Sequence, residues 1–239
     1  MSVTSRVRLV ITASLLAGGV FSTRAAEVTS QCRIVGPNNP PPQPGDYLAT
    51  AYHDELKRTL SPRAARKTTT LPFARVARED AGLSMAVGTF EEGAGEVVLS
   101  DSGVARPGYP DGACTVVLSD TSHFSLATGS HTPLAQYTRI GDLDLWVSDV
   151  LFVGRYTDKE GRIYVFERDG TAAFDGKPIR YSISEPEGYG FEDGNIMIGG
   201  QHFRFERTQK ALKLYGPFNG AAPAPSNPMY ALKVAAVVR

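Results

Sequence analysis

The sequence predicts an all-β protein, an antiparallel meander or barrel of about 10–12 strands with one N-terminal helix. Two observations predict this class. Short segments with period-2 alternation of apolar and polar residues follow one another, and Asp-Gly or Gly-Gly pairs separate several of them, a pattern typical of antiparallel hairpins. No crossover helices separate the strands, and this excludes a parallel α/β sheet, whose connections need them.

Residues 1–26 have the composition of a secretory signal peptide. Arg6 and Arg8 precede an apolar run from Leu9 to Phe21, and small residues near Ala25-Ala26 suit cleavage. The run is shorter than the roughly 20 residues that a membrane-spanning helix needs. We therefore expect a cleaved signal, no transmembrane span in the mature chain, and a periplasmic or secreted location.

Composition and charge narrow the function classes. The 239 residues include 25 basic and 25 acidic side chains, and removing the three arginines of residues 1–26 leaves 22 basic against 25 acidic ones, a formal charge of −3. So weak a charge gives no electrostatic basis for nucleic-acid binding. The 42% hydrophobic content is enough for a core, and we expect one β-barrel-like domain over residues 46–239.

The cysteine content predicts a disulfide. Cys32 and Cys114 are the two cysteines of the chain, and an even number in an exported protein predicts one disulfide. Two separate thiols are the alternative. Residues 27–45 form a Pro-rich extended segment, because residues 36–45 contain five prolines.

The predicted helix covers residues 46–60, where Leu48, Tyr52, Leu56 and Leu60 recur on one face. After it, Ser61 suits an N-cap and Pro62 a first helical position, so a second short helical turn is expected. A basic cluster surrounds this junction. Its members are Arg58, Arg63, Arg66 and Lys67, which fit a solvated helix flank or, alternatively, contact with an anionic surface or ligand.

Strand-like segments begin after residue 71. They are residues 83–90, 96–99, 113–119, 123–127, 143–153, 162–167, 172–174, 179–184, 195–198, 202–206, 211–215 and 229–238. Residues 143–153 are predicted to be a long strand with Trp146, the only tryptophan, at its centre. For residues 229–238 a final strand pairing back with the body is expected, and a short helix is the alternative. The tripeptides Gly45-Asp46-Tyr47 and Gly154-Arg155-Tyr156 each precede a new unit and could mark two related halves.

The meander of residues 151–216 carries the candidate ligand-binding residues. In a closed barrel some alternating aromatic side chains must point inward, where they fill the interior or line a cavity. The candidates for lining a cavity are Tyr164, Phe166, Tyr181, Phe203 and Phe205.

At Gly154-Arg155-Tyr156 and the meander that follows, the chain resembles the calycin class of β-barrels, which includes the lipocalins. The resemblance covers residues 140–217 and is architectural. Calycin barrels tend to open with Gly-x-Trp, whereas this chain has tyrosine at the third position. The chain is also similar to secreted bacterial proteins of unassigned function with calycin-like barrels. The resemblance implies a cup that can bind a small apolar ligand.

Few residues suggest catalysis. The chain lacks a nucleophile elbow, a zinc-protease motif and a phosphate loop. His53 and Asp54 are neighbours on the predicted helix and are expected to diverge, and His202 is expected to point outward. His123 and His131 could hold a metal together with Asp120 or Asp149, but ordinary loop histidines are the prediction. Paired carboxylates of an acidic loop could serve glycoside hydrolysis, although a plain solvated turn is the prediction. The loop residues are Glu185, Glu187, Tyr189, Phe191, Glu192 and Asp193.

These observations predict an exported soluble β-barrel without catalytic residues, metal ligands or cofactors. Its partner would be a small apolar ligand or an envelope protein, and not nucleic acid. The alternatives are a hydrolase of envelope polymers that uses carboxylates or histidines, and a structural component of the envelope.

Overall fold

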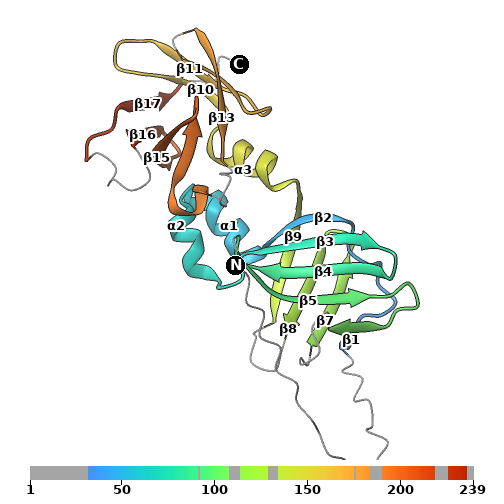
Figure 1. Ribbon diagram of the computed structural model, residues 1–239. Helices are drawn as coiled ribbons and strands as arrows, with labels where there is room; N and C mark the ends of the chain where they lie inside the picture. The colour runs from blue at the N-terminus through green and yellow to red at the C-terminus, as the bar shows by residue number, and fades with distance from the viewer. Residues whose placement is uncertain are drawn as a thin grey trace, which may run out of the picture.

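Two β-sheets with helices between them make up the computed structural model (Figure 1). The described residues are 32–90, 92–107, 114–128, 134–174, 176–183, 190–218 and 226–235. The all-β class is confirmed. The predicted signal peptide, residues 1–26, lies outside the described residues.

The first sheet has nine strands in the order β1-β7-β8-β9-β2-β3-β4-β5-β6. They are β1 (Arg33–Val35), β2 (Gly45–Ala49), β3 (Phe73–Glu79), β4 (Gly82–Gly88), β5 (Gly93–Leu99), β6 (Ala105–Pro107), β7 (Cys114–Asp120), β8 (His123–Thr128) and β9 (Ala135–Gly141). From β2 to β9, sequence neighbours pair antiparallel except at β6 and β7, and β9 returns to pair with β2. The result is a strongly curved meander.

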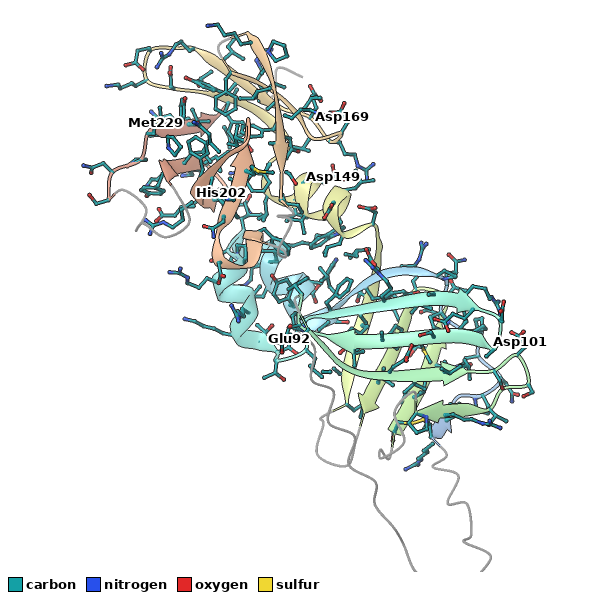
Figure 2. All side chains as sticks on the ribbon, viewed as in Figure 1. Glu92, Asp101, Asp149, Asp169, His202 and Met229 are labelled. Atoms are coloured by element: carbon teal, nitrogen blue, oxygen red, sulfur yellow. A yellow bond between two sulfur atoms is a disulfide. The ribbon has the colours of Figure 1, made fainter. Side chains whose placement is uncertain are left out.

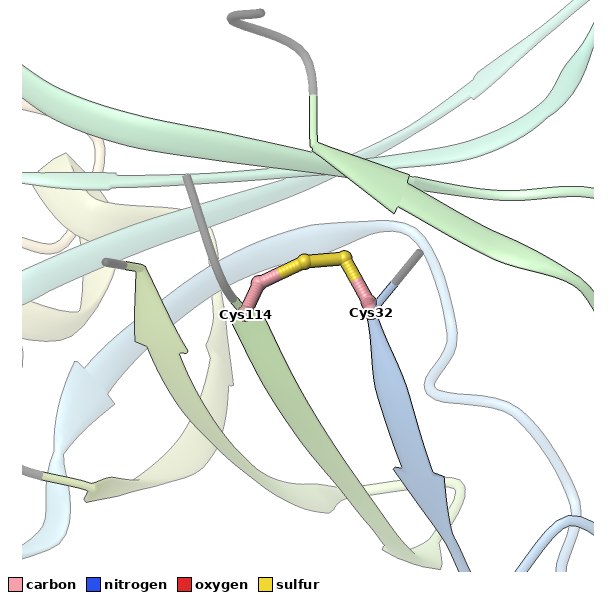
Figure 3. The surroundings of a disulfide bond; sticks show 2 residues. All are labelled: Cys32 and Cys114. Atoms are coloured by element: carbon pink, nitrogen blue, oxygen red, sulfur yellow. A yellow bond between two sulfur atoms is a disulfide. The ribbon is translucent and has the colours of Figure 1, made fainter. Parts of the chain in front are cut away.

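The N-terminal strand bridges β6 and β7, the two sequence neighbours that do not pair with each other. β1 runs parallel to β7, and the Cys32 N–H donates to the Ala105 carbonyl of β6 at 3.2 Å. The predicted disulfide between Cys32 and Cys114 is confirmed and joins the starts of β1 and β7 (Figure 3). The Pro-rich segment then follows the sheet, because Asn39 Nδ2 donates to the Leu118 carbonyl at 2.7 Å.

The second sheet is a closed barrel of eight antiparallel strands. They are β10 (Gly154–Thr157), β11 (Ile163–Phe166), β12 (Thr171–Phe174), β13 (Lys177–Ser182), β14 (Asn195–Ile198), β15 (Gln201–Thr208), β16 (Ala211–Phe218) and β17 (Tyr230–Val234). The last strand closes the barrel by pairing with β10, so the predicted final strand is confirmed over its described residues. An eight-stranded closed barrel is compatible with a calycin-like architecture.

The two Gly-x-Tyr tripeptides occupy corresponding places at the start of two consecutive eight-strand meanders, β2–β9 and β10–β17. Gly45 and Gly154 have φ angles of 137° and 148°, which favour glycine. Tyr47 and Tyr156 are buried, and each hydroxyl donates at 2.6 Å to the carbonyl four residues earlier. The two halves therefore begin with the same local structure.

The N-terminal helix starts later than the sequence predicts. Residues 46–49 belong to β2, and α1 covers Thr50–Thr59. β2 lies between β3 and β9, so both of its backbone edges are paired, and a helix beginning at residue 46 would lose those bonds. After α1 come α2 (Pro62–Ala65) and the 3₁₀ turn η1 (Arg66–Thr68). The predicted N-cap is confirmed, since the Ser61 hydroxyl accepts from the Ala64 N–H.

The predicted strand at residues 143–153 is wrong, because Leu143–Leu151 form helix α3. Leu143, Val147 and Leu151 recur every four residues and are buried, whereas Leu145 is 40% exposed. The Asp142 carboxylate caps the helix by accepting from the Leu145 N–H at 2.9 Å. No helix within the described part of the chain is long and apolar enough to cross a membrane.

The helices pack between the sheets, and one continuous buried core connects both halves. The ring of Phe90, after β4, lies 5.1 Å from that of Phe191 in the 3₁₀ turn η2 (Gly190–Asp193). His53 of α1 stacks on Trp146 of α3 with ring centroids 5.1 Å apart. These contacts fix the position of one sheet relative to the other. A single folding domain over residues 46–239 stays a prediction.

Candidate binding site

The predicted aromatic candidates lie inside the closed barrel and touch one another through a shared cluster. Tyr164, Phe166, Tyr181, Phe203 and Phe205 are at most 6% exposed. The rings of Phe166 and Tyr181 are 5.3 Å apart, at a separation typical of favourable edge-to-face pairs. These side chains pack against one another as core.

The phenol groups of this cluster have partners within the protein. The Tyr181 hydroxyl donates to the Glu167 carbonyl at 2.7 Å, and the Tyr164 hydroxyl donates to the Asp158 carboxylate at 3.1 Å. Burial, with the neighbouring Asp158 carboxylate, raises the pKa of Tyr164 to about 12. These bonds satisfy the hydroxyls without a ligand.

Sequence reasoning missed the residue that joins these rings. Phe152, which follows α3, is fully buried. Its ring centroid lies 4.8 Å from that of Phe205 and 6.0 Å from that of Tyr181. The incorrect prediction of a strand at residues 143–153 prevented its identification, because the direction of the Phe152 side chain depends on the preceding helix.

The histidines do not converge within the described residues. His53 Nδ1 lies 2.8 Å from Asp54 Oδ1, so the expectation that these side chains diverge is wrong: the ring, stacked on Trp146, still reaches its neighbour's carboxylate. His123 Nδ1 contacts Asp120 Oδ1 at 3.0 Å in the β7–β8 turn. His131 lies outside the described residues.

The acidic loop is only partly described. Glu185, Glu187 and Tyr189 lie outside the described residues, as does the side chain of Glu192. Phe191 is fully buried, whereas Asp193 is exposed and pairs with Arg66 Nη1 at 3.3 Å. Among the labelled side chains, Asp101 lies on the first sheet, away from Asp149, Asp169 and His202 (Figure 2). In the described part of the chain no three histidine, cysteine or acidic side chains gather as a metal site would require.

A groove runs between the α1–α2 junction and the closed barrel. It is lined by residues 60–63, 193–194 and 204–207 and has a volume of about 390 Å³. We call it the helix–barrel groove. Small-molecule sites commonly enclose about 300–1,000 Å³, so the size suits a small ligand.

Local backbone geometry builds both walls of the groove. Leu60 adopts a left-handed conformation with φ 56° at the end of α1, which turns the chain sharply into Ser61 and Pro62 of the next helix. On the other wall, Gly194 has φ 82°, and its carbonyl accepts from the Phe205 N–H at 2.6 Å. This bond attaches η2 to β15.

Half of the lining residues are charged. The groove holds three arginines, Arg63, Arg204 and Arg207, and two carboxylates, Asp193 and Glu206. The arginines are in excess, so the electrostatic potential favours negative charge.

Two of these side chains already have partners within the protein. Arg207 Nε donates to the Leu151 carbonyl at 3.0 Å, which ties β15 to the end of α3. Glu206 accepts from the Tyr215 hydroxyl at 2.7 Å and lies 3.8 Å from Lys213 Nζ. Burial and the Glu206 carboxylate raise the pKa of Tyr215, so this hydroxyl stays a donor at neutral pH.

Arg204 is held by an aromatic ring. Its guanidinium carbon lies 4.8 Å from the centroid of the Tyr215 ring, a cation–π distance. Among the described residues neither Arg204 nor Arg63 forms an ion pair.

A smaller pocket of about 190 Å³ lies between the Pro-rich segment and the first sheet. Its apolar lining comes from Ile34, Leu83, Leu99 and Leu118. An apolar cavity of about 150 Å³ can hold benzene, so the size of this pocket suits a very small molecule, although Arg78 and Asp101 also line it.

The predicted site residues thus lie either in the barrel core or on the surface. The helix–barrel groove was not predicted, although Arg63 belongs to the basic cluster noted in the sequence.

Comparison with known proteins found no family model, no curated protein and no solved structure that matches the chain.

Proposed function

We propose that the chain is an exported, non-catalytic binding protein whose ligand site is the helix–barrel groove. The observation that carries the proposal is the groove itself, which has the size of a small-molecule site and walls from both halves of the chain. The closed eight-stranded barrel is compatible with a calycin-like architecture, and that analogy of fold supports a binding role in general but not this particular site. Export is supported by the signal-like residues 1–26 and by the disulfide, because such bonds persist in oxidising compartments.

The hydrolase alternative would need the two carboxylates of the groove to act as an acid–base pair. Asp193 pairs with Arg66, and Glu206 accepts from Tyr215 and lies near Lys213. Both carboxylates are thus engaged with side chains of the protein, whereas the carboxylates of a hydrolase must face the scissile bond. The contacts therefore favour binding over hydrolysis.

A small apolar ligand is the second candidate, and the pocket beneath the Pro-rich segment favours it. Its volume of about 190 Å³ limits the ligand to the size of benzene or toluene. Toluene should then shift the amide resonances of Leu99 and Leu118, and it should leave those of Gly194 and Arg204 unchanged.

The test of the groove is a ligand screen with a variant that blocks it. Arg63→Trp places a bulky indole at the groove, and Lys67→Trp makes the same change on exposed η1, away from the lining. Compounds of neutral, anionic and cationic character are screened by thermal shift. Ligands of the groove should stabilise the wild type and the Lys67→Trp variant but not Arg63→Trp. Equal stabilisation of all three proteins by every hit would contradict the proposal, and binding of macromolecules alone would favour a protein partner.

A further inference from the structure

The helix–barrel groove presents one arginine that is already oriented for a ligand. The Arg204 guanidinium lies over the Tyr215 ring at 4.8 Å, and that ring is itself fixed by its hydroxyl bond to Glu206. Stacking on one face leaves the in-plane N–H donors of a guanidinium available, and these match a carboxylate or phosphate in two parallel bonds. Arg204 therefore loses little conformational freedom when it binds an oxyanion.

A second arginine faces the groove from the helical wall. Arg63 follows Pro62 at the start of α2 and lines the same groove. It forms no ion pair among the described residues, as noted above, so its charge is available to a ligand.

The two carboxylates of the groove already have partners within the protein. Asp193 has Arg66 as its partner, and Glu206 has Tyr215 and Lys213. Arg207 is bound to backbone carbonyls, including that of Leu151, and those carbonyls do not cancel its charge. Positive charge in the groove thus remains uncompensated.

From these observations we infer that the helix–barrel groove binds a compact anion with a carboxylate or phosphate group, recognised by Arg63 and Arg204. The inference rests on the proposed binding function and specifies its ligand class. Asp193 and Glu206 limit the ligand, because an extended polyanion would meet their negative charge.

The test is a titration with inorganic phosphate and with propionate, followed by amide resonances in NMR at low ionic strength. Glycerol and choline serve as the neutral and cationic comparisons. Either anion should shift the amides of Gly194 and of residues 204–207 saturably, and the two arms distinguish phosphate from carboxylate recognition. The comparisons should leave these amides in place.

Variants connect the shifts to the two arginines. Arg63→Gln and Arg204→Gln should each weaken binding at least about tenfold, as expected for the loss of a charge-assisted contact. Arg204→Lys, which keeps the charge but loses the planar donor pair, should fall between these and the wild type. Lys67→Gln and Arg155→Gln are matched controls on exposed positions outside the groove and should leave affinity unchanged.

The outcomes separate this inference from the proposed function. Unchanged anion affinity in both Arg→Gln variants, or shifts spread evenly over all basic positions, would overturn the anion site. Neutral or cationic ligands that shift the groove amides, and that Arg63→Trp blocks, would overturn the anion class and leave the binding function standing. If no compound perturbs these amides, both proposals fail.

Discussion

Single residues fix the start of each half. Tyr47 and Tyr156 are buried within their sheets, and each hydroxyl closes a turn on the carbonyl four residues earlier. An arginine lies against each start: Arg139 Nη2 donates to the Pro44 carbonyl at 3.0 Å, and the Arg207 guanidinium lies 5.5 Å from the Tyr156 ring centroid. Tyrosine is therefore required at this position, because phenylalanine would lack the hydroxyl that makes this hydrogen bond.

Tyr156→Phe should lower the free energy of unfolding by about 1–3 kcal/mol, because it leaves the buried Phe152 carbonyl without its donor. Urea denaturation measures this loss. Tyr164→Phe is the matched comparison, since its hydroxyl bonds a carboxylate that Arg162 also contacts, and it should cost less. Equal losses in the two variants would show that the Phe152 carbonyl finds another partner.

Buried tyrosines also predict how stability depends on alkaline pH. Burial raises the pKa of Tyr47 to about 12 from an ordinary value of 10.0, and Tyr164 shifts in the same direction. A pKa raised by folding contributes stability that is complete below pH 10 and is lost as the pH rises through about 12. We expect the free energy of unfolding to fall across this interval, together with the rise of tyrosinate absorbance. Flat stability across it would contradict the burial of these phenols.

At the scale of elements, the sequence predicts strands better than helices. Alternation with tight turns marks the strands of the closed barrel, because one face of each strand is buried and the other is exposed. The same alternation gives the wrong prediction for residues 143–153, because Leu143 and Val147 fit both a two-residue and a helical period over so short a segment. The Asp142 cap decides between them, and the helix signal was present in the sequence as an Asp before an apolar segment.

The cap of α3 gives an element-scale prediction. Asp142→Ala should lower the free energy of unfolding by about 1 kcal/mol, because the Leu145 N–H loses its acceptor. Asp142→Ser keeps a side-chain oxygen at the N-cap and should restore most of the loss. Denaturation followed by Trp146 fluorescence reports on this helix directly. An alanine variant as stable as the wild type would mean that the Asp46 carboxylate, which accepts from the Leu143 N–H at 3.1 Å, is a sufficient cap.

At the scale of the whole molecule, the binding groove lay beyond sequence reasoning. Its walls come from residues 60–63 and residues 204–207, and no local period relates segments so far apart. The position of the disulfide was predictable because two cysteines allow only one pairing. Its role in joining β1 to β7, across from β6, depends on the topology of the first sheet.

Removing the disulfide should destabilise the first sheet. Cys32 and Cys114 are 82 residues apart, and closing a loop of that length is worth about 4–5 kcal/mol in the chain-entropy account. The Cys32→Ser/Cys114→Ser double variant should lose roughly this free energy of unfolding in urea. Adding reductant should lower the wild type to the same value and leave the double variant unchanged. If reductant did not change the stability of the wild type, the pairing of β1 with β7, and not the disulfide, would stabilise this part of the sheet.

The continuous core predicts that both halves unfold together. Phe90 and Phe191 touch across the boundary with centroids 5.1 Å apart, and Trp146 lies in the helix between the sheets, stacked on His53. Fluorescence of Trp146 and far-ultraviolet circular dichroism should therefore give one coincident transition. Phe191→Ala removes a fully buried ring and should cost about 3–5 kcal/mol. Because that ring joins the halves, the variant should also separate the fluorescence and circular dichroism signals into distinct transitions. Phe174→Ala is the control, because it removes a ring within the barrel. It should lower stability without separating the two signals. Two transitions already in the wild type would mean that the halves are independent domains and that the groove between them opens without unfolding either one.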